Sequence, residues 1–221
     1  MSAGKRSKKA NRAWMHQHLT DPYVRQAQKD GYRARAAYKL QEIDAALHLI
    51  QPGQCVIDLG SAPGAWSQYV ARKLQLPAGS ASNAAVLIAI DLLHMEPVDG
   101  VQFVQGDFRE DETLARLGHL LAGRRADVVL SDMAPNLSGI ASADAARAGH
   151  LVELAVDLAA TTLQPHGNLV AKVFHGSGYS QLVRLFKDTF EQVKVIKPQA
   201  SRSRSAETYL VGRRLREPGT R

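Results

Sequence analysis

The sequence predicts an α/β protein with a mostly parallel sheet and helices on both faces. Short apolar segments of strand length alternate with amphipathic segments of helical periodicity along most of the chain. A glycine-rich turn follows the first apolar segment, as in folds that present backbone N–H groups to a nucleotide-like ligand. The last two apolar segments are joined by a connection without room for a helix, so we expect this final pair to be antiparallel.

The expected elements follow from periodicity. In the first helix, Ala37, Leu40, Ile43 and Leu47 share one face. Helices are expected over 34–50, 65–74, 113–121, 143–163 and 181–189. Strands are expected over 53–60, 85–91, 101–107, 126–132, 167–174, 191–197 and 207–214, which gives a seven-stranded sheet whose last strand is antiparallel. The segment 76–84 is a loop by composition.

The chain length and composition suit one domain. The 221 residues are 45% hydrophobic, enough to fill one core. We expect a basic flexible tail over 1–20, a single domain over 21–214 and a short C-terminal tail over 215–221. A single cysteine, Cys55, indicates a reducing compartment, and no secretory signal or apolar run of bilayer length is present. We therefore expect a cytoplasmic protein without a membrane anchor.

Positive charge is concentrated in two distant regions. The chain has 28 Lys and Arg against 21 Asp and Glu, a net charge of +7. Cations gather over 2–35, with tyrosines interleaved near the end of that stretch, and again over 197–207. This pattern favours a polyanion partner such as nucleic acid, although the first dozen residues could equally form a solvated tail. The candidate RNA contacts are Arg33, Arg35, Lys39, Arg202 and Arg204.

Carboxylates recur at the ends of the first four expected strands. The acids are Asp58, Asp91, Asp107 and Asp132, and Lys172 lies near the end of the fifth strand. Because ligands bind at the carboxyl edge of a parallel sheet, these side chains predict a binding site. Asp91 is placed to accept hydrogen bonds from ribose hydroxyls, whereas Asp107 and Asp132 could also be helix N-caps.

The turn "DLGSAPGAW" does not match the motifs that bind a pyrophosphate. Neither G-x-G-x-x-G nor G-x-x-x-x-G-K-[ST] occurs in the chain. A glycine turn surrounded by acids suits a neutral or cationic adenosine ligand better, and S-adenosylmethionine, whose sulfonium is positive, fits this description. The missing fingerprint also argues against a nicotinamide-dependent oxidoreductase.

A family resemblance rests on a series of motifs. "RARAAYKLQEID", "VIDLGSAPGAWSQYV", "SDMAPNLSG", "LVAKVFHG" and "SRSRSAETYLV" occur in order between residues 31 and 213. Together they resemble the FtsJ-like ribosomal RNA 2′-O-methyltransferases, the bacterial enzymes that act on a uridine of the large-subunit 23S rRNA. The segment 74–86 is longer than the family's usual connection. The resemblance implies a Rossmann-like, S-adenosylmethionine-dependent methyltransferase acting on ribosomal RNA within the large subunit.

The resemblance also implies the site residues. The family's catalytic tetrad falls on Lys39, Asp132, Lys172 and Glu207. Its cofactor contacts fall on Gly64, Trp66, Asp91, Asp107 and Asp132. Taken alone, Trp66 would more often be a core residue, and a strand-end lysine could be a surface group.

The chemistry gives this tetrad a purpose. A ribose 2′-hydroxyl must lose its proton as it attacks the methyl carbon. Lys172 could accept that proton if desolvation and a second cation, Lys39, favour its neutral form, or it could only align the hydroxyl. His175, in the loop after the same strand, is a weaker candidate for the base.

Two further alternatives are considered at this point. A nucleic-acid-binding protein with an inactive methyltransferase fold would have a broken tetrad, whereas all four residues are present. A 2′-O-methyltransferase acting on tRNA or another RNA needs the same catalytic residues, and only the resemblance favours ribosomal RNA. The scattered histidines suggest no metal site, and we expect a monomer.

Overall fold

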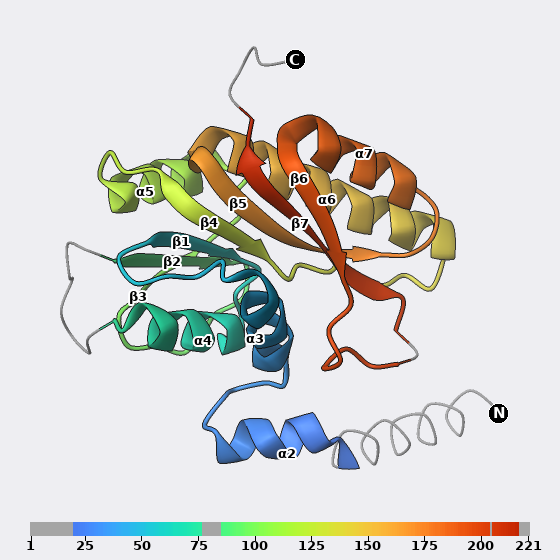
Figure 1. Cartoon of the computed structure of the whole chain (residues 1–221), viewed down its shortest axis with the longest axis horizontal. Coiled ribbons are helices and arrows are strands. Elements are labelled where there is room, and N and C mark those ends of the chain that lie inside the picture. The colour runs from blue at the N-terminus through green and yellow to red at the C-terminus, as the bar shows by residue number, and fades with distance from the viewer. Residues whose placement is uncertain (1–19, 77–84, 204, 217–221) are drawn as a thin grey trace.

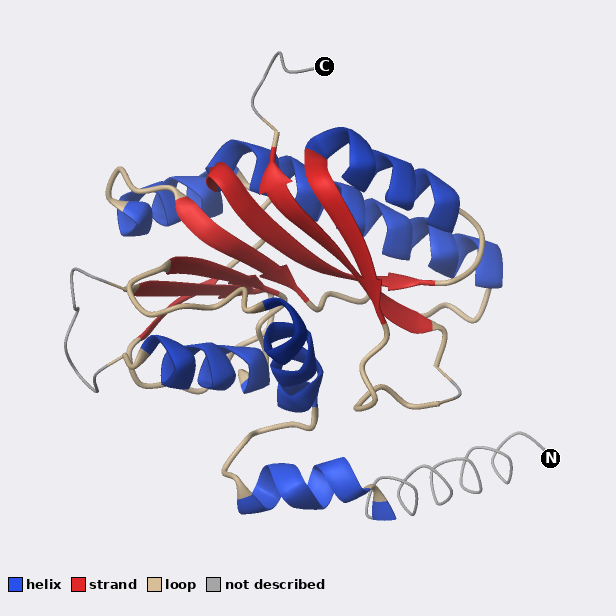
Figure 2. Ribbon diagram, in the orientation of Figure 1, coloured by secondary structure: helices blue, strands red, loops and turns tan. Residues whose placement is uncertain are grey.

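The computed structural model describes residues 20–76, 85–203 and 205–216 (Figure 1). Its strands form one seven-stranded sheet in the order β3-β2-β1-β4-β5-β7-β6. Figure 2 shows the sheet between helices packed on both of its faces. The expected α/β class is confirmed. No helix among these residues is long and apolar enough to cross a membrane.

All the expected helices and strands are present, with ends shifted by a few residues. The strands are β1 (Cys55–Leu59), β2 (Val86–Asp91), β3 (Val101–Gln105), β4 (Ala126–Ser131), β5 (Leu163–Phe174), β6 (Phe190–Ile196) and β7 (Glu207–Leu215). The helices are α2 (Pro22–Lys29), α3 (Ala36–Leu47), α4 (Ala65–Leu74), α5 (Asp111–Leu121), α6 (Ala141–Thr162) and α7 (Tyr179–Thr189). Most of the expected tails over 1–20 and 215–221 and of the expected loop over 76–84 lies outside the described residues, at 1–19, 217–221 and 77–84.

Helix α2 was not anticipated from periodicity. Its N-terminus nevertheless carries a local signal, because the Asp21 side chain accepts a hydrogen bond from the Tyr23 N–H and a proline occupies the first turn. The helix has only eight residues, few of them apolar, and it buries only Val24 and Ala27, so few positions mark it in the sequence.

The direction of β7 determines what reaches the carboxyl edge of the sheet. β1 to β5 pair in parallel, whereas β7 lies between β5 and β6 and is antiparallel to both. The expected antiparallel pair is therefore confirmed. Because of this direction, β7 begins where β5 ends: Glu207 lies opposite Phe174, and Tyr209 lies opposite Lys172.

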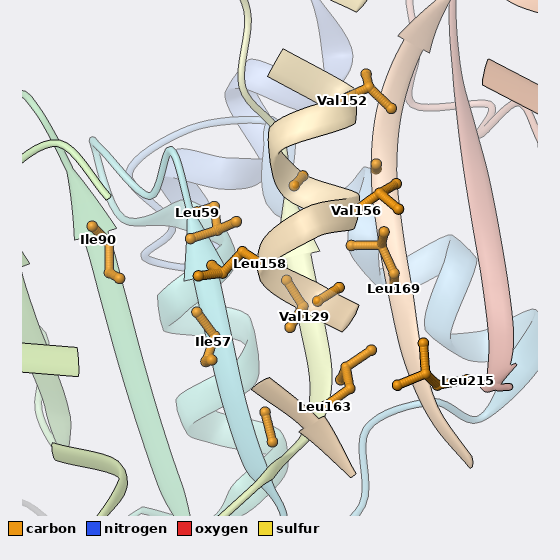
Figure 3. Close-up of a cluster of buried hydrophobic side chains, with 14 of the residues drawn as sticks. Ile57, Leu59, Ile90, Val129, Val152, Val156, Leu158, Leu163, Leu169 and Leu215 are labelled. Carbon is orange, nitrogen blue, oxygen red and sulfur yellow. The ribbon is translucent and has the colours of Figure 1, made fainter. Parts of the chain in front are cut away.

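The two faces of the sheet have separate cores. Helices α5, α6 and α7 cover one face, where Ile57, Val129 and Leu169 pack against residues such as Val156 of α6 (Figure 3). Helices α3 and α4 cover the other, with Val56, Val170 and Tyr209. Because strand side chains alternate, Lys172 points to the same face as Val170 and Tyr209, toward α3.

Gly212 allows β7 to sit between its neighbours. A Cβ at this position would lie 2.3 Å from a ring carbon of Phe190, a fully buried side chain of β6. In α5, by contrast, a Cβ at Gly118 would meet nothing within 4 Å. The two glycines therefore offer a matched test of packing.

We expect Gly212→Ala to lower the free energy of unfolding by about 1–3 kcal/mol, because the buried Phe190 ring cannot move without strain. Gly118→Ala should instead raise it by about 0.5–1 kcal/mol, since alanine is the better helix former. Urea denaturation of both variants checks the pair. Equal stability of Gly212→Ala and wild type would contradict the packing described for β7.

Candidate active site

The centre of the site is a largely buried lysine near the end of β5. The ammonium of Lys172 donates to the Asp132 carbonyl at 2.6 Å and lies 3.2 Å from the carboxylate Oδ1 of the same residue. The Lys172 side chain is only 9% exposed. Asp132 directly follows β4, the neighbouring strand, so adjacent strand ends bring the two groups together. The charge is therefore held by a specific partner, as a buried ammonium requires.

A second ion pair joins α3 to the start of β7. The Lys39 ammonium lies 2.6 Å from Oε1 of Glu207, and both side chains are largely buried. Burial alone would raise the pKa of Glu207, but the Lys39 charge and its hydrogen bond, with smaller contributions from Ser201 and Lys172, lower it below its usual value. Glu207 is thus a carboxylate at neutral pH, and it is close enough to Lys172 to interact with both cations.

Tyr209 was not anticipated as part of the site. Its hydroxyl donates to Oδ1 of Asp132 at 2.7 Å, the same oxygen that faces Lys172. Burial, followed by the charges of Asp132 and Glu207, raises the pKa of Tyr209 well above its usual value, so the phenol stays protonated and donates. The spacing of Glu207 and Tyr209 was a usable signal, because residues two apart in a strand share a face.

A cleft of about 760 Å³ opens beside the second ion pair. Its lining residues come from the start of α3 and from the loop before β7: Ala34, Arg35, Ala36, Lys39, Arg202, Ser203, Ser205 and Glu207. The structure therefore brings together Arg35, Lys39 and Arg202, three of the predicted RNA contacts. Arg204 lies outside the described residues.

Arg35 holds the walls of this cleft together. Its guanidinium pairs with the carboxylate of Asp21 and donates to the carbonyl of Ala200. Burial and the nearby charge of Arg202 lower the pKa of Arg35 from its usual value. The cleft thus places two guanidinium groups near each other, an arrangement that favours an anionic ligand.

The glycine turn follows β1, so it lies at the same carboxyl edge of the sheet, beside the end of β2. Asp91 accepts hydrogen bonds from the Ala62 N–H at Oδ2 and from the Leu93 N–H at Oδ1, each 2.8 Å long. Gly60 and Gly64 have φ values of 70° and 107°, which L side chains rarely adopt. Asp91 therefore fastens the turn to the end of β2, and its remaining lone pairs are available to a ligand.

Two buried oxygens near this turn have no partner in the described structure. These are Oδ1 of Asp58 and Oγ of Ser61. The other carboxylate oxygen of Asp58 accepts from the Ser67 hydroxyl at 2.7 Å. Burial raises the pKa of Asp58 to about 7, with Ser67 opposing the shift and nearby carboxylates adding to it. Unpaired buried acceptors are costly, so this pair favours a donor-bearing ligand at the turn.

The other two predicted cofactor residues are already engaged. The Asp107 carboxylate accepts from the guanidinium and the backbone N–H of Arg109, and these hydrogen bonds lower the pKa of Asp107. The Trp66 side chain is 3% exposed, donates to the Ala36 carbonyl and packs on Tyr209 with ring centroids 5.7 Å apart. Trp66 is thus a core residue behind the site, and direct cofactor contacts by either residue stay predictions.

Two further expectations can be placed in the structure. The His175 ring stacks on Tyr179 with a centroid distance of 4.4 Å, beyond the end of β5. Arg33, a predicted RNA contact, donates instead to three backbone carbonyls, at Pro63, Glu96 and Pro97. Within the described ranges, no group of three His, Cys, Asp or Glu residues could hold a metal ion.

Comparison with known proteins gives consistent matches. A family model described as FtsJ-like methyltransferase matches residues 32–215. The "Ribosomal RNA large subunit methyltransferase E" of Paracidovorax citrulli (strain AAC00-1) is 61% identical over 219 residues, covering 98% of this chain and 100% of the relative. The protein of the same name from Variovorax paradoxus (strain S110) is 59% identical over 222 residues, covering 100% of both.

A solved structure also matches over most of the chain. It is described as a ribosomal RNA methyltransferase from Plasmodium falciparum, with a TM-score of 0.72 and 27% identity, and the match covers 83% of this chain and 98% of that one. The family model's match over residues 32–215 includes Asp91, Asp132 and Lys172.

The raised pKa of Asp58 predicts a pH-dependent stability. The folded protein binds the Asp58 proton more tightly than the unfolded chain, so stability falls as the pH rises from about 4 to about 7. We expect Asp58→Asn, which cannot ionise, to be more stable than wild type at pH 8 by an amount on the order of 2–4 kcal/mol. Urea denaturation at pH 5 and pH 8 measures this.

The exposed carboxylate of Asp157 in α6 supplies the control. Asp157→Asn should follow the wild-type stability at both pH values, because the exposed side chain is solvated in the folded and unfolded states. If the wild-type protein instead became more stable relative to Asp58→Asn at pH 8 than at pH 5, this would contradict the raised pKa of Asp58.

Proposed function

The chain belongs to the FtsJ-like methyltransferase family, and on this premise we propose that it transfers the methyl group of S-adenosylmethionine to the 2′-hydroxyl of a uridine ribose in large-subunit ribosomal RNA. The observation that carries the proposal is the pairing of Lys172 with Asp132 and of Lys39 with Glu207 at one edge of the sheet. The names of the close relatives support ribosomal RNA as the substrate.

The residues around the glycine turn fit the cofactor that FtsJ-like methyltransferases use. S-adenosylmethionine supplies an electrophilic methyl group on a positively charged sulfonium. Asp91 has carboxylate lone pairs for ribose hydroxyls beyond the two backbone donors it already accepts. The unpaired oxygens of Asp58 and Ser61 are suited to an amino donor, and the negative charges nearby favour a cation.

Lys172 is the residue that meets the 2′-hydroxyl in this proposal. Two fixed oxygens of Asp132 hold its ammonium, and Tyr209 fixes the carboxylate in turn. A side chain held in this way can align a hydroxyl for attack. If Lys172 is deprotonated, its amine accepts the hydroxyl proton; if it remains an ammonium, it steers the hydroxyl by hydrogen bonding and the proton passes to solvent water after the methyl transfer.

Lys39 and Glu207 lie between Lys172 and the cleft proposed to bind RNA. Their ion pair lines the cleft and interacts with Lys172 through Glu207. Arg35, Arg202 and Lys39 supply positive charge for the phosphates of the RNA. Arg204 remains a predicted contact of the same kind. We propose that residues 21–214 act as a single domain and that the enzyme is a cytoplasmic monomer acting within the large subunit.

The direct test is methyl transfer from labelled S-adenosylmethionine to large-subunit ribosomal RNA, followed by mapping of the modified nucleotide. We expect one 2′-O-methyluridine. Methylation of tRNA with no transfer to ribosomal RNA would support the alternative substrate, whereas methylation of a base in place of a ribose would overturn the proposed chemistry.

We expect Asp91→Ala to weaken binding of S-adenosylhomocysteine by about tenfold to a hundredfold, because ribose donors lose their acceptor and the turn loses its fastening to β2. Isothermal titration calorimetry measures the affinity, and Asp157→Ala serves as a control that removes an exposed carboxylate. Unchanged affinity in a folded Asp91→Ala protein would refute the cofactor role of this acid.

Substitution of Lys172 tests the chemistry. Lys172→Ala should lower kcat by about 10²–10⁴-fold while binding S-adenosylhomocysteine almost normally, because the lysine acts on the hydroxyl. Lys172→Arg keeps the charge but cannot act as a base near neutral pH. Substantial activity in the arginine variant would identify Lys172 as a positioning cation.

Lys187→Ala gives the matched control for the lysine series. Lys187 is exposed near the end of α7, on the opposite face of the sheet from α3. Its loss should leave kcat unchanged. An active Lys172→Ala enzyme would exclude the whole tetrad assignment.

A further inference from the structure

We infer that Arg33 is a positioning residue for the cofactor site, which it shapes by clamping together the two loops on either side of Asp91. This inference rests on the proposed function, because it assigns a task to one residue of that site. It also separates Arg33 from Arg35 and Arg202, with which the charge pattern had grouped it as a contact for RNA.

The backbone around Arg33 is fixed on α4. The Arg33 N–H donates to Oε1 of Gln68 at 2.8 Å, and the Gln68 amide donates back to the Gly31 carbonyl at 3.1 Å. Arg72, also in α4, donates to the Asp30 carbonyl and lies over the Tyr32 ring. The Arg33 side chain therefore extends from an anchored segment, which reduces the entropy lost in holding its guanidinium.

The guanidinium spans two loops that follow adjacent strands. Nη1 donates to the Pro63 carbonyl at 2.9 Å and to the Glu96 carbonyl at 2.6 Å, and Nη2 donates to the Pro97 carbonyl at 2.6 Å. Pro63 belongs to the glycine turn after β1, whereas Glu96 and Pro97 belong to the loop after β2. One planar group thus holds two loops at a fixed separation.

The two clamped loops both contact Asp91. The Ala62 N–H, next to Pro63, donates to Oδ2 of Asp91, and the Leu93 N–H of the second loop donates to Oδ1. Asp91 holds the loops where they leave the sheet, and Arg33 holds them farther out. Moving either loop would therefore change the position of the carboxylate proposed to bind the ribose.

Gly64 leaves the room that the guanidinium needs. A Cβ at Gly64 would come within 2.8 Å of Nη1 of Arg33 and 3.0 Å of the Met95 sulfur. Gly64, a predicted cofactor residue, and Arg33 are therefore in close contact on the same turn. The absence of a side chain at Gly64 therefore allows both the positive φ of the turn and the close approach of the Arg33 guanidinium.

Lysine cannot replace the clamp. Its ammonium is a single donor centre, whereas the contacts in the structure use both terminal nitrogens of a rigid fork. We expect Arg33→Ala to raise the Kd for S-adenosylhomocysteine and the KM for S-adenosylmethionine by about tenfold, with Arg33→Lys intermediate. The KM for RNA should change much less, because the guanidinium serves the loops.

Two variants control for other effects of losing an arginine. Arg72→Ala removes one contact of this segment with α4, whereas the Gln68 hydrogen bonds and the loop contacts of Arg33 remain, so it should weaken S-adenosylhomocysteine binding much less than Arg33→Ala does. Arg202→Ala removes a cation from the cleft and should raise the KM for RNA while leaving cofactor affinity unchanged. This opposite pattern would be the signature of separate tasks for Arg33 and Arg202.

The measurements are calorimetry with S-adenosylhomocysteine and steady-state kinetics with varied cofactor and RNA. Wild-type affinity in Arg33→Ala would overturn the inference, as would a rise in the KM for RNA alone, which would mark a phosphate contact. Equal losses in Arg33→Ala and Arg72→Ala would assign both arginines to general folding and also overturn it. A wild-type protein that binds S-adenosylhomocysteine but transfers no methyl group to RNA would refute the proposed function and leave the clamp standing.

Discussion

The antiparallel pairing of β5 with β7 is the constraint on which the active site depends. A parallel strand in the place of β7 would begin at the opposite edge of the sheet, far from the end of β5. In the observed direction, Glu207 lies opposite Phe174 and Tyr209 opposite Lys172, on the face covered by α3. Gly212 permits this arrangement because the ring of Phe190, on the neighbouring strand β6, occupies the space that a side chain at position 212 would need. Packing at one end of β7 thus supports chemistry at the other.

The second constraint is charge balance in a site with little solvent. The ion pairs Lys39–Glu207 and Lys172–Asp132 are close enough for Glu207 to interact with the charge of Lys172, so the cluster is neutral as a set although each member alone would be expensive to bury. Such a cluster is poor evidence for stability, since well-packed apolar residues often do better. Asp44 shows the structural alternative: it is buried too, but Tyr69 and Lys73 of α4 and the Ile50 N–H are its partners, so it ties α3 to α4 and to the segment after α3. The placement of the lysines beside a cleft is what distinguishes the functional cluster.

Local patterns were enough to predict the elements and part of the site. Apolar periodicity found every described strand and all the helices except α2, which has only eight residues and buries two small apolar side chains. Strand-end acids pointed to Asp91 and Asp132 because strand ends share an edge. Lys39 and Glu207, by contrast, entered through a family resemblance, since nothing local indicates that α3 and β7 meet. The insertion of β7 between β5 and β6, and with it the role of Tyr209, depends on long-range pairing that the chain does not encode in any one segment.

Arg33 and Arg35 show where reasoning from charge stops. Net positive charge predicts the kind of partner, because long-range attraction depends little on the exact position of each cation. It does not predict which cation touches that partner, because short-range contacts depend on the direction in which each side chain leaves the backbone. Only two residues apart, Arg33 reaches the loops around Asp91 whereas Arg35 reaches Asp21 and Ala200 beside the cleft. One anchored segment between α2 and α3 therefore touches both halves of the site. A shift of this segment when one ligand binds would change the affinity for the other ligand, and by thermodynamic linkage any such coupling is reciprocal.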